Sequence, residues 1–412
     1  MTSDELCTAL LETFDGFVPH PLVIAAAVVD GDECVTAVSP DKHATGRFEI
    51  GSIGKTMTVT ALSSLVLDGT LSLGDEIGRW FEVGTNSDIT LRQLATHTAG
   101  LPRLAPNHAD HESDQDDPYR CYGPEQAEAG LRAATRGDGS RQYSNFGIQL
   151  LGLVVVRATG LDYDDALRER LWGPLGMPAT SVTGRQHPIV QGYAGERPVP
   201  PWQGLLPGPG LLTSTIADMT AYLRAVISPS DAPVGAAISH AIEHDLGWAS
   251  TPDGWFWHNG RTAGGKTMLM AGPQARRGAV ALTNSGGLEE LDHAVALAAR
   301  GKDPRPARPV PVGPDFDEVI QSVVQELVAN DWVALRSRMP DSMREALTIE
   351  LLAGAWSNTM GERGELESST TRSVVRISGA VRADIHLTFS QGEGSARAQF
   401  DDERNLIGIQ ID

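Results

Sequence analysis

The stretch FEIGSIGKTMTVTAL, residues 48–62, places Lys55 inside an otherwise apolar run with helical spacing. The chain has 33 basic residues, and only four of them are lysines: Lys42, Lys55, Lys266 and Lys302. Arginine cannot lose its proton near neutral pH, whereas a desolvated lysine can. The choice of lysine at position 55 therefore indicates a residue that works as a base.

Ser52 lies one helical turn before Lys55, so its hydroxyl and the lysine amine can meet on one face of a helix. The N-terminus of that helix would favour negative charge developing on oxygen, so the pair is predicted to be nucleophile and base. Spacing alone is weak evidence, because a second copy occurs at Ser39-Pro-Asp-Lys42. There the Pro-Asp pair predicts a turn with a solvated lysine. A lysine that snorkels to the surface is the alternative for Lys55.

The bulk composition excludes several classes of partner. The 412 residues carry a net charge of −20 and a pI near 4.9, which argues against nucleic acid and against an anionic membrane surface. Cys7, Cys34 and Cys121 are too few and too scattered for a disulfide framework or a metal site. The N-terminus lacks the basic residues of a signal peptide, and the apolar run 22–29 is too short to span a bilayer. We therefore expect a cytoplasmic protein without a membrane partner.

Hydrophobic patterns predict a mixed α/β (α+β) chain. Two β-prone runs in 22–38 surround an Asp-Gly-Asp turn and predict a hairpin, and 52–68 is predicted to be helical. Further helices are expected at 146–159, 162–171 and 214–226, and strands at 247–250, 254–258, 267–271 and 278–284. The segment 106–128 has no apolar period and is predicted to be a long surface loop that could act as a lid.

The last quarter of the chain predicts a separate domain. Residues 301–314, GKDPRPARPVPVGP, are proline-rich and predict a semi-rigid linker between a domain at 1–300 and another at 315–412. An amphipathic helix is expected from Phe316 onward, and alternating apolar residues predict antiparallel strands at 381–389 and 407–411. The tail is thus predicted to be a small α+β unit.

Several motifs give the chain a resemblance to one superfamily. Between residues 20 and 300 it resembles the serine β-lactamase and penicillin-binding-protein superfamily, in its class C-like, D-alanyl-carboxypeptidase and esterase branch. This resemblance implies an antiparallel sheet flanked by helices plus a helical subdomain. The motifs that carry it occur in order: FEIGSIGK (48–55), DGTLSLGDEIGRW (68–80), ITLRQLATHTAGLP (89–102), YSNFGIQLLGLVVVRATG (143–160), RLWGPLGMPAT (170–180), GPGLLTSTIADMTAYL (208–223) and HNGRTAGG (258–265).

The resemblance assigns roles to the residues near the nucleophile. Ser52 would be acylated, and Lys55 would be the base that deprotonates it. Tyr143 would share the proton relay to the leaving group, while Asn145 would orient Lys55 and bind the acyl side of the substrate. Considered singly, Tyr143 reads as a packing tyrosine and Asn145 as a turn residue.

The last of these motifs, HNGRTAGG (258–265), completes the expected site. His258 and Gly260 would lie on a strand edge beside the nucleophile, and the backbone N–H groups of Ser52 and Arg261 would form the oxyanion hole. His258 stands where many relatives have a lysine that grips a carboxylate, and this departure favours esters or amides over β-lactams. Arg261 is a candidate replacement cation, although its side chain need not point the same way.

Two rival metal signals are weaker. His240-Ala-Ile-Glu-His244 fits an inverted zincin pattern, but a strand start at Gly247 would leave little helix and no third ligand is evident. The histidines and acidic residues of 106–128 could hold a cation loosely, although a solvated acidic loop accounts for them better. We expect no metal and no cofactor.

The expected function is that of a serine hydrolase or acyltransferase acting on a small ester or amide. Its partners would be a small-molecule acyl donor and an amine or alcohol acceptor in addition to water. The superfamily includes intracellular natural-product transacylases, so a role in secondary metabolism is expected. A sensor that acylates once and turns over slowly is the competing class.

The tail, 315–412, resembles the cone-shaped domains of the nuclear-transport-factor-like superfamily. This rests on helix-helix-strand order and on FDEVIQSVVQELVANDW (316–332) and FDDERNLIGIQID (400–412). It predicts either a homodimer through this domain or partial covering of the active site.

Overall fold

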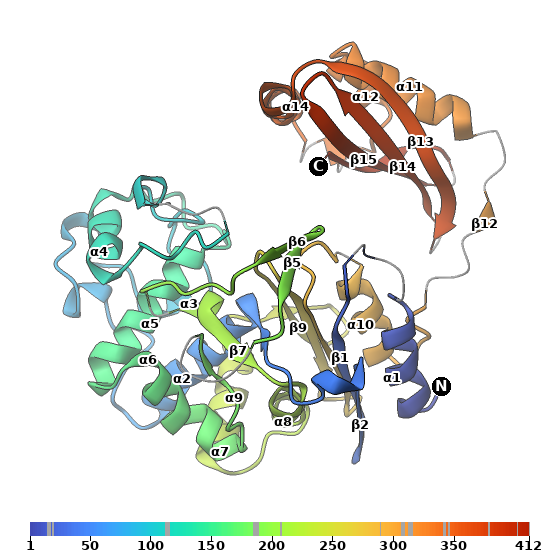
Figure 1. The fold of residues 1–412 in the computed structure, drawn as a ribbon. Coiled ribbons are helices and arrows are strands. Elements are labelled where there is room, and N and C mark those ends of the chain that lie inside the picture. Colours follow the sequence, from blue (N-terminus) through green and yellow to red (C-terminus); the bar gives the residue numbers. More distant parts are fainter. Residues whose placement is uncertain are drawn as a thin grey trace. The chain divides into compact units, whose positions relative to one another are not determined.

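The computed structural model describes the chain except residues 15–17, 19, 112–115, 184–188, 207, 289, 306–309, 312–315, 341–342, 345–346, 378–379, 402 and 412. The chain divides into two compact units, Met1–Arg305 and Pro306–Asp412 (Figure 1). Each unit has its own hydrophobic core.

The first unit is built on a six-stranded antiparallel sheet in the order β2-β1-β11-β10-β9-β8. The predicted hairpin and the predicted group of late strands are confirmed, and together they form this sheet although the sequence separates them widely. The strands are β1 Ile24–Asp30, β2 Glu33–Ser39, β8 Ala249–Ser250, β9 Phe256–Arg261, β10 Lys266–Gly272 and β11 Arg277–Thr283.

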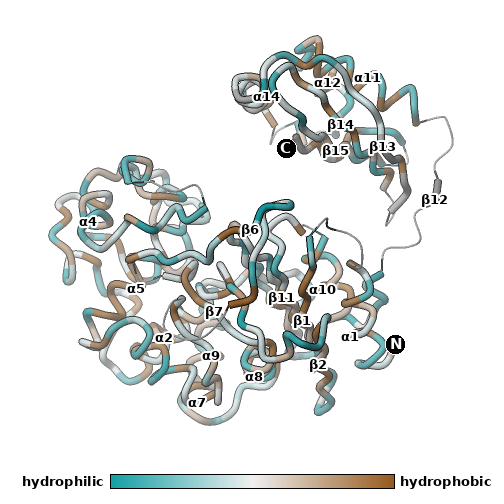
Figure 2. The backbone as a smooth tube through the Cα atoms, viewed as in Figure 1, coloured by the Kyte–Doolittle hydropathy of each residue, from teal (hydrophilic) through white to brown (hydrophobic). Residues whose placement is uncertain are grey.

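Helices cover both faces of the sheet, so its central strands are buried on both sides. Along β1, Ala25 and Ala27 belong to one hydrophobic cluster, and Ile24 and Ala26 belong to the other. The second cluster includes residues of α1 (Ser3–Glu12) and α10 (Leu291–Ala299); the first includes residues of α2 (Gly54–Leu67) and α8 (Ile216–Ile227). The continuous apolar run of β1, coloured brown in Figure 2, is the sequence expected of a strand buried on two faces.

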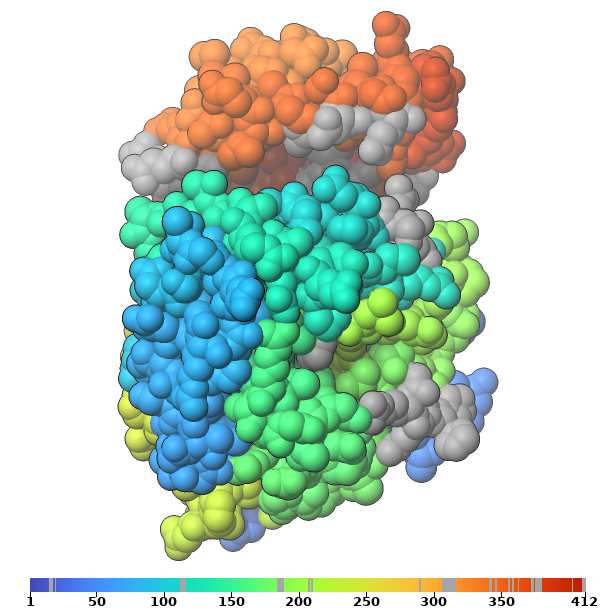
Figure 3. All heavy atoms as spheres, turned by 90° about the vertical axis from the view of Figure 1, so that its left-hand side faces the viewer, coloured from blue at the N-terminus to red at the C-terminus, as the bar shows by residue number. Residues whose placement is uncertain are grey.

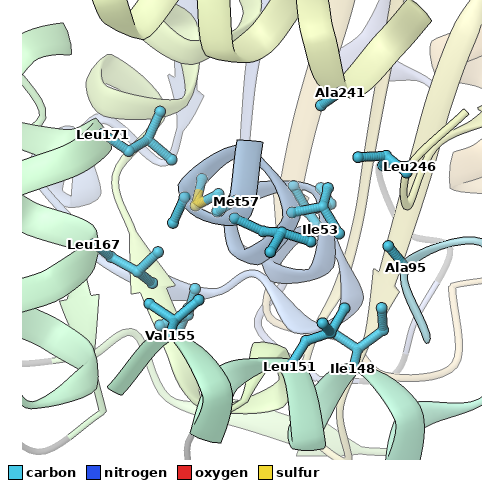
Figure 4. Packing of buried hydrophobic residues seen from close by; sticks show 14 of the residues in the cluster. Ile53, Met57, Ala95, Ile148, Leu151, Val155, Leu167, Leu171, Ala241 and Leu246 are labelled. Carbon is cyan, nitrogen blue, oxygen red and sulfur yellow. The ribbon is translucent and has the colours of Figure 1, made fainter. Parts of the chain in front are cut away.

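Helix α2 is the centre of the larger cluster. Ile53 and Met57 lie among side chains from surrounding helices and loops, including Val155, Leu167 and Leu246 (Figure 4). Three threonines on α2 stay buried because their hydroxyls donate to helix carbonyls, at 2.7 to 3.0 Å. The helix predicted at 52–68 is confirmed, and it is preceded by a single 3-10 turn, Gly51–Ile53.

The helices α5 (Asn145–Thr159), α6 (Tyr163–Leu167) and α9 (Pro233–Glu243) pack against α2. Figure 3 shows blue, teal and green segments of the first unit side by side on one face. The first unit also has two small sheets, with the strand orders β3-β7-β4 and β5-β6. The bounds are α3 Leu91–Ala95, α4 Pro124–Ala133, α5 Asn145–Thr159, α6 Tyr163–Leu167, α7 Gly173–Leu175, α9 Pro233–Glu243, β3 Phe48–Glu49, β4 Ser181–Val182, β5 Gly192–Ala194, β6 Arg197–Val199 and β7 Leu212–Ser214, with a π-helical segment at Arg168–Trp172.

Two predictions about this unit need correction. The segment 106–128 is not loop throughout, because α4 begins at Pro124, where proline suits the first turn of a helix; residues 112–115 lie outside the described residues. The expectation that little helix would remain around His240 is wrong, since α9 continues to Glu243 before the chain turns toward β8.

The second unit is a five-stranded sheet, β12-β13-β14-β15-β16, and in the described part of the unit α11, α12 and α14 pack on its apolar side. On β14 buried and half-buried residues alternate strictly, as predicted for 381–389. The elements are α11 Asp317–Val328, α12 Trp332–Ser337, α14 Ile349–Arg363, β12 Val310–Pro311, β13 Leu366–Ile377, β14 Ala380–Phe389, β15 Gly392–Phe400 and β16 Leu406–Ile411.

The predicted linker 301–314 is divided by the structure. Residues up to Arg305 belong to the first unit, and Val310–Pro311 pair with β13 in the second; residues 306–309 and 312–314 lie outside the described residues. Among the described helices, none alone has the length and apolarity to cross a membrane. One pair, Asn145–Thr159 with Tyr163–Leu175, reaches that length and apolarity only across an 83° bend.

Candidate active site

The predicted nucleophile and base are in contact at the start of α2. Ser52 lies in the 3-10 turn Gly51–Ile53, and Lys55 lies in the first turn of the helix, so the short i, i+3 rise brings their side chains together. Lys55 Nζ is 2.7 Å from Ser52 Oγ. The hydroxyl therefore has a proton acceptor within hydrogen-bond reach, provided the lysine is neutral.

Burial makes the neutral form of Lys55 accessible. The side chain is 1% exposed, and among the described residues no carboxylate pairs with it. Desolvation lowers the pKa of Lys55 well below its ordinary value, and the positive charge of Arg103 lowers it further. The surface-lysine alternative is therefore excluded for this position.

Tyr143 lies beside this pair at the entrance to α5. Its ring centroid is 4.8 Å from Lys55 Nζ, and its phenol is close enough to the Ser52 hydroxyl for Ser52 to affect its pKa. Burial raises the pKa of Tyr143, while the Ser52 hydroxyl and the charge of Arg103 partly oppose the rise. Tyr143 thus stays protonated at neutral pH and can donate a proton.

The residue after Tyr143 fixes its position. Ser144 is the N-cap of α5, and its hydroxyl accepts from Gly147 N while donating to Pro102 O. Its own N–H donates to His97 Nδ1 at 3.2 Å. The tyrosine is therefore held by a cap that is tied to the loop between α3 and α4.

The backbone geometry fits the predicted oxyanion hole. In the β9–β10 hairpin Thr262 N donates to Gly265 O, so the next pair, Arg261 with Lys266, is a non-hydrogen-bonded pair. The N–H of Arg261 consequently points away from β10. On that side lies Gly51, where an added Cβ would come within 2.7 Å of Arg261 N. The N–H groups of Ser52 and Arg261 thus belong to backbones in close contact.

Gly260 is the residue that allows this approach. A Cβ at position 260 would lie 2.1 Å from Ile50 O and 2.4 Å from Thr267 Oγ1. Thr267 Oγ1 donates to the same Ile50 carbonyl at 3.1 Å. A side chain at 260 would therefore separate β9 from the nucleophile turn.

His258 is buried in the same site as a neutral ring. Burial lowers its pKa to about 3, and a positive charge on Lys55 would lower it further. Its Nδ1 lies 2.6 Å from Asn259 O, which can only accept, so Nδ1 carries the proton. His258 therefore does not supply the positive charge of the lysine that it replaces.

Asn145 corrects one predicted contact. It lines the pocket near Ser52, but its amide Nδ2 donates to Tyr119 Oη at 3.3 Å, and among the described residues it does not bond Lys55. Its Oδ1 is buried without a hydrogen-bond partner in the described part of the chain. The prediction that Asn145 orients Lys55 is thus not met, whereas an acceptor facing substrate is compatible with its position.

These residues open into one cavity of about 890 Å³. Aromatic side chains of Tyr119, Trp202 and Trp257 form part of its wall, together with Arg103. Of the predicted site residues, the cavity is lined by Ser52, Lys55, Tyr143, Asn145, His258 and Arg261, and Gly260 backs onto it. The structure therefore brings all the predicted site residues together.

Sequence reasoning missed Glu49. Glu49, three residues before Ser52, is buried; its carboxylate accepts from Trp202 N at 3.0 Å and from Thr262 Oγ1 at 3.1 Å. Burial raises the pKa of Glu49 to about 7. Glu49 lies on β3, just before the turn that carries Ser52, and its hydrogen bond to Thr262 connects β3 to the hairpin that bears Arg261. The signal available was an acidic residue inside an apolar stretch.

Metal sites find no support in the described residues. Nowhere in them do three or more histidine, cysteine or acidic side chains gather with metal-binding geometry. In α9 the rings of His240 and His244 stack at 4.1 Å, and His240 Nδ1 lies 3.1 Å from Ser63 Oγ. Packing and hydrogen bonding account for this pair.

Comparison with known proteins shows what the first unit is similar to. A sequence model of the Beta-lactamase family matches residues 20–301. The chain is 28% identical to a beta-lactamase of Yersinia enterocolitica over 196 residues, which cover 46% of this chain and 48% of that protein. It is 30% identical to the D-alanyl-D-alanine-carboxypeptidase/endopeptidase AmpH of Escherichia coli (strain K12) over 194 residues, 43% of this chain and 48% of that one. The chain spans about half the length of these curated relatives.

Solved structures show the same fold. The crystal structure of a beta-lactamase/D-alanine carboxypeptidase from Pseudomonas syringae is similar with a TM-score of 0.61 at 21% identity, covering 72% of this chain and 98% of that one. A class C beta-lactamase from Rhodobacter sphaeroides gives 0.57 at 20% identity, with 70% and 96% covered. The predicted fold class is therefore confirmed, while the nuclear-transport-factor-like resemblance of the tail stays a prediction. Since the family model matches well over half of its residues, the chain belongs to the beta-lactamase family.

Proposed function

We propose that the protein is a serine hydrolase that forms an acyl-enzyme on Ser52 with a small ester or amide. One observation carries the proposal: Ser52 Oγ lies 2.7 Å from the amine of a lysine that is 1% exposed. A buried amine held in its neutral form beside a hydroxyl is the arrangement that activates a serine nucleophile.

The steps of the proposed reaction follow from the site. Ser52 Oγ attacks the carbonyl carbon and its proton passes to Lys55 Nζ. The carbonyl oxygen becomes an oxyanion that accepts from the N–H groups of Ser52 and Arg261. The tetrahedral intermediate then collapses, the leaving group takes a proton through Tyr143, and an ester to Ser52 remains. Water attacks that ester to release the acid and restore the serine.

Transfer to an amine or alcohol is the second candidate, because it uses the same acyl-enzyme with a different final nucleophile. The cavity of about 890 Å³ favours it, being large enough for an acceptor beside a small acyl group. Turnover of β-lactams is less favoured, since a neutral His258 stands at the start of HNGRTAGG, where many relatives have a lysine.

The test is intact-mass spectrometry with chromophore release after incubation with an activated p-nitrophenyl ester. Wild type and Ser39→Ala are expected to release many equivalents of p-nitrophenol, and Ser52→Ala none. A single stable adduct would indicate a slow sensor instead, and equal release by Ser52→Ala would overturn the assignment. Adding amines or alcohols distinguishes transfer from hydrolysis by the product mass, and a chromogenic cephalosporin tests β-lactam turnover.

A further inference from the structure

The wall of the active-site cavity has the opposite charge balance from the protein. The whole chain carries a net charge of −20. Among the described residues the cavity is lined by one acidic side chain, Asp116, and by five basic ones: Lys55, Arg103, Arg197, Arg261 and Lys266. A basic cavity in an acidic protein attracts anions and focuses them on the site.

Most of these cations already have another role. Arg197 forms an ion pair with Asp116, and Lys266 Nζ lies 3.0 Å from Asp292. Lys55 is the buried base, and the backbone of Arg261 belongs to the oxyanion hole. Unlike Arg197 and Lys266, Arg103 has no carboxylate partner in the described part of the chain, and unlike Lys55 its side chain is exposed to the cavity.

Arg103 is also held close to the reacting groups. Its carbonyl accepts from Asn145 N at 3.0 Å and from Phe146 N at 3.2 Å, which fastens its backbone to the start of α5. Its guanidinium carbon is 5.3 Å from the ring centroid of Tyr143. The charge reaches the chemistry, since Arg103 helps to lower the pKa of Lys55. An anion bound by Arg103 would therefore lie beside the acyl group on Ser52.

We propose that Arg103 is a specificity-determining residue that selects acyl donors carrying an anionic group, such as a carboxylate, on the acyl portion. This inference rests on the proposed acyl-enzyme at Ser52. The guanidinium provides a planar fork of donors that matches an anionic group in two-point contact, which neither the neutral His258 ring nor the aromatic wall can offer.

The test compares two p-nitrophenyl esters of equal chain length, the glutarate monoester and the uncharged pentanoate. Wild type is expected to prefer the glutarate ester in kcat/KM, and added salt should reduce the preference. In Arg103→Gln the ratio of the two values should fall by about 10- to 100-fold, the range for loss of a hydrogen bond to a charged group. Arg103→Lys should recover part of the ratio, because it restores the charge without the fork.

Arg197→Gln is the matched control, since it removes a cavity arginine whose charge is already met by Asp116. Its ratio is expected to stay within a few-fold of wild type. The inference is overturned if wild type shows no preference, or if Arg103→Gln and Arg197→Gln change the ratio equally. If neither ester is turned over and Ser52 is not acylated, the proposed function itself fails, which is a distinguishable result.

Discussion

The chain contains the same four-residue pattern twice, and the two copies differ in everything except spacing. Ser39 and Lys42 lie at the end of β2 and in a 3-10 turn, and both are exposed. Ser52 and Lys55 lie at the start of a helix whose first three turns are buried, with Lys55 1% exposed. The pair of side chains is therefore not the catalytic unit by itself. Desolvation of the lysine is what converts the pattern into a base.

The surroundings of the second copy come from distant segments. Tyr143 approaches from the start of α5, and β9 presents Arg261 and Gly260 to the nucleophile turn. At Ser39 the neighbouring strand is β1 alone, through the pair Ile24 with Ser39. The comparison teaches that acyl-transfer chemistry here depends on what the fold packs around the pattern, and the following variants test each part of that packing.

Replacing the lysine of each copy by arginine should give the largest difference in activity between the two copies. Lys55→Arg keeps a positive charge but removes a group that can become neutral, so kcat/KM for a p-nitrophenyl ester should fall by about 10³- to 10⁴-fold. Lys42→Arg should leave kcat/KM unchanged. Steady-state kinetics measure both, with circular dichroism to verify folding. Equal activity of Lys55→Arg and wild type would show that the reaction does not need a neutral amine at position 55, and would overturn the assignment of Lys55 as the base.

A methyl group at Gly260 tests the second difference, the contact of β9 with the nucleophile turn. In Gly260→Ala the new Cβ would meet Ile50 O at 2.1 Å, so the strand must move and carry the Arg261 N–H with it. We expect a fall of about 10²- to 10³-fold in kcat, the range for loss of one oxyanion donor.

Gly287→Ala is the matched control for that variant. Gly287 is exposed and has no heavy atom within 4 Å of an added Cβ, so its kcat should match that of wild type. Wild-type kcat in Gly260→Ala, with the fold intact, would exclude the Arg261 N–H as an oxyanion donor.

The difference between the two copies also marks what the sequence could predict. Local patterns sufficed for the helix at 52–68, for the hairpin and for the Ser52–Lys55 contact, because these depend on neighbouring residues. Their grouping with Tyr143 and Arg261 followed only from resemblance, since no local pattern encodes a contact between β9 and the turn before α2. The fold supplies that contact.

The residues that were missed or misassigned depend on distant partners. Glu49 stands in the quoted stretch, yet its role follows from bonds to Trp202 and Thr262, which are 153 and 213 residues away in the sequence. Asn145 was expected to bond Lys55, but its amide turns toward Tyr119, a residue of the segment predicted as an undifferentiated loop. Side-chain direction of this kind is set by tertiary packing.

Tyr143→Phe tests the proton transfer to the leaving group, which is expected only at the Ser52–Lys55 copy because Tyr143 lies beside it. The variant removes the phenol that contacts Ser52, and we expect kcat/KM for a simple alkyl ester to fall by about 10²-fold, at the lower end of general acid–base effects. The loss should be smaller for a p-nitrophenyl ester, whose leaving group departs without a proton. Equal losses for the two esters would show that Tyr143 does not protonate the leaving group.

The smallest effect on activity is expected at Glu49. There the consequence of burial should appear in the pH dependence of the free energy of unfolding. The pKa of Glu49 in the folded chain is about 7 against an ordinary 4.5, because it is buried. Between these pH values the folded carboxyl holds its proton while the unfolded one has lost it. The free energy of unfolding should therefore decrease as pH rises from about 4.5 to about 7, by about 3 kcal/mol in total.

Chemical denaturation across this pH range would measure the contribution of Glu49. Glu49→Gln cannot titrate, so its free energy of unfolding should lack this part of the decrease, while groups common to both proteins cancel in the difference. Asp41→Asn, beside the exposed Lys42, is the matched control and should follow wild type within about 0.5 kcal/mol. Parallel pH profiles for wild type and Glu49→Gln would mean that Glu49 ionises normally in the folded chain. The surroundings of Ser52 would then be more hydrated than their packing indicates, and the contrast with Ser39 would rest on Lys55 alone.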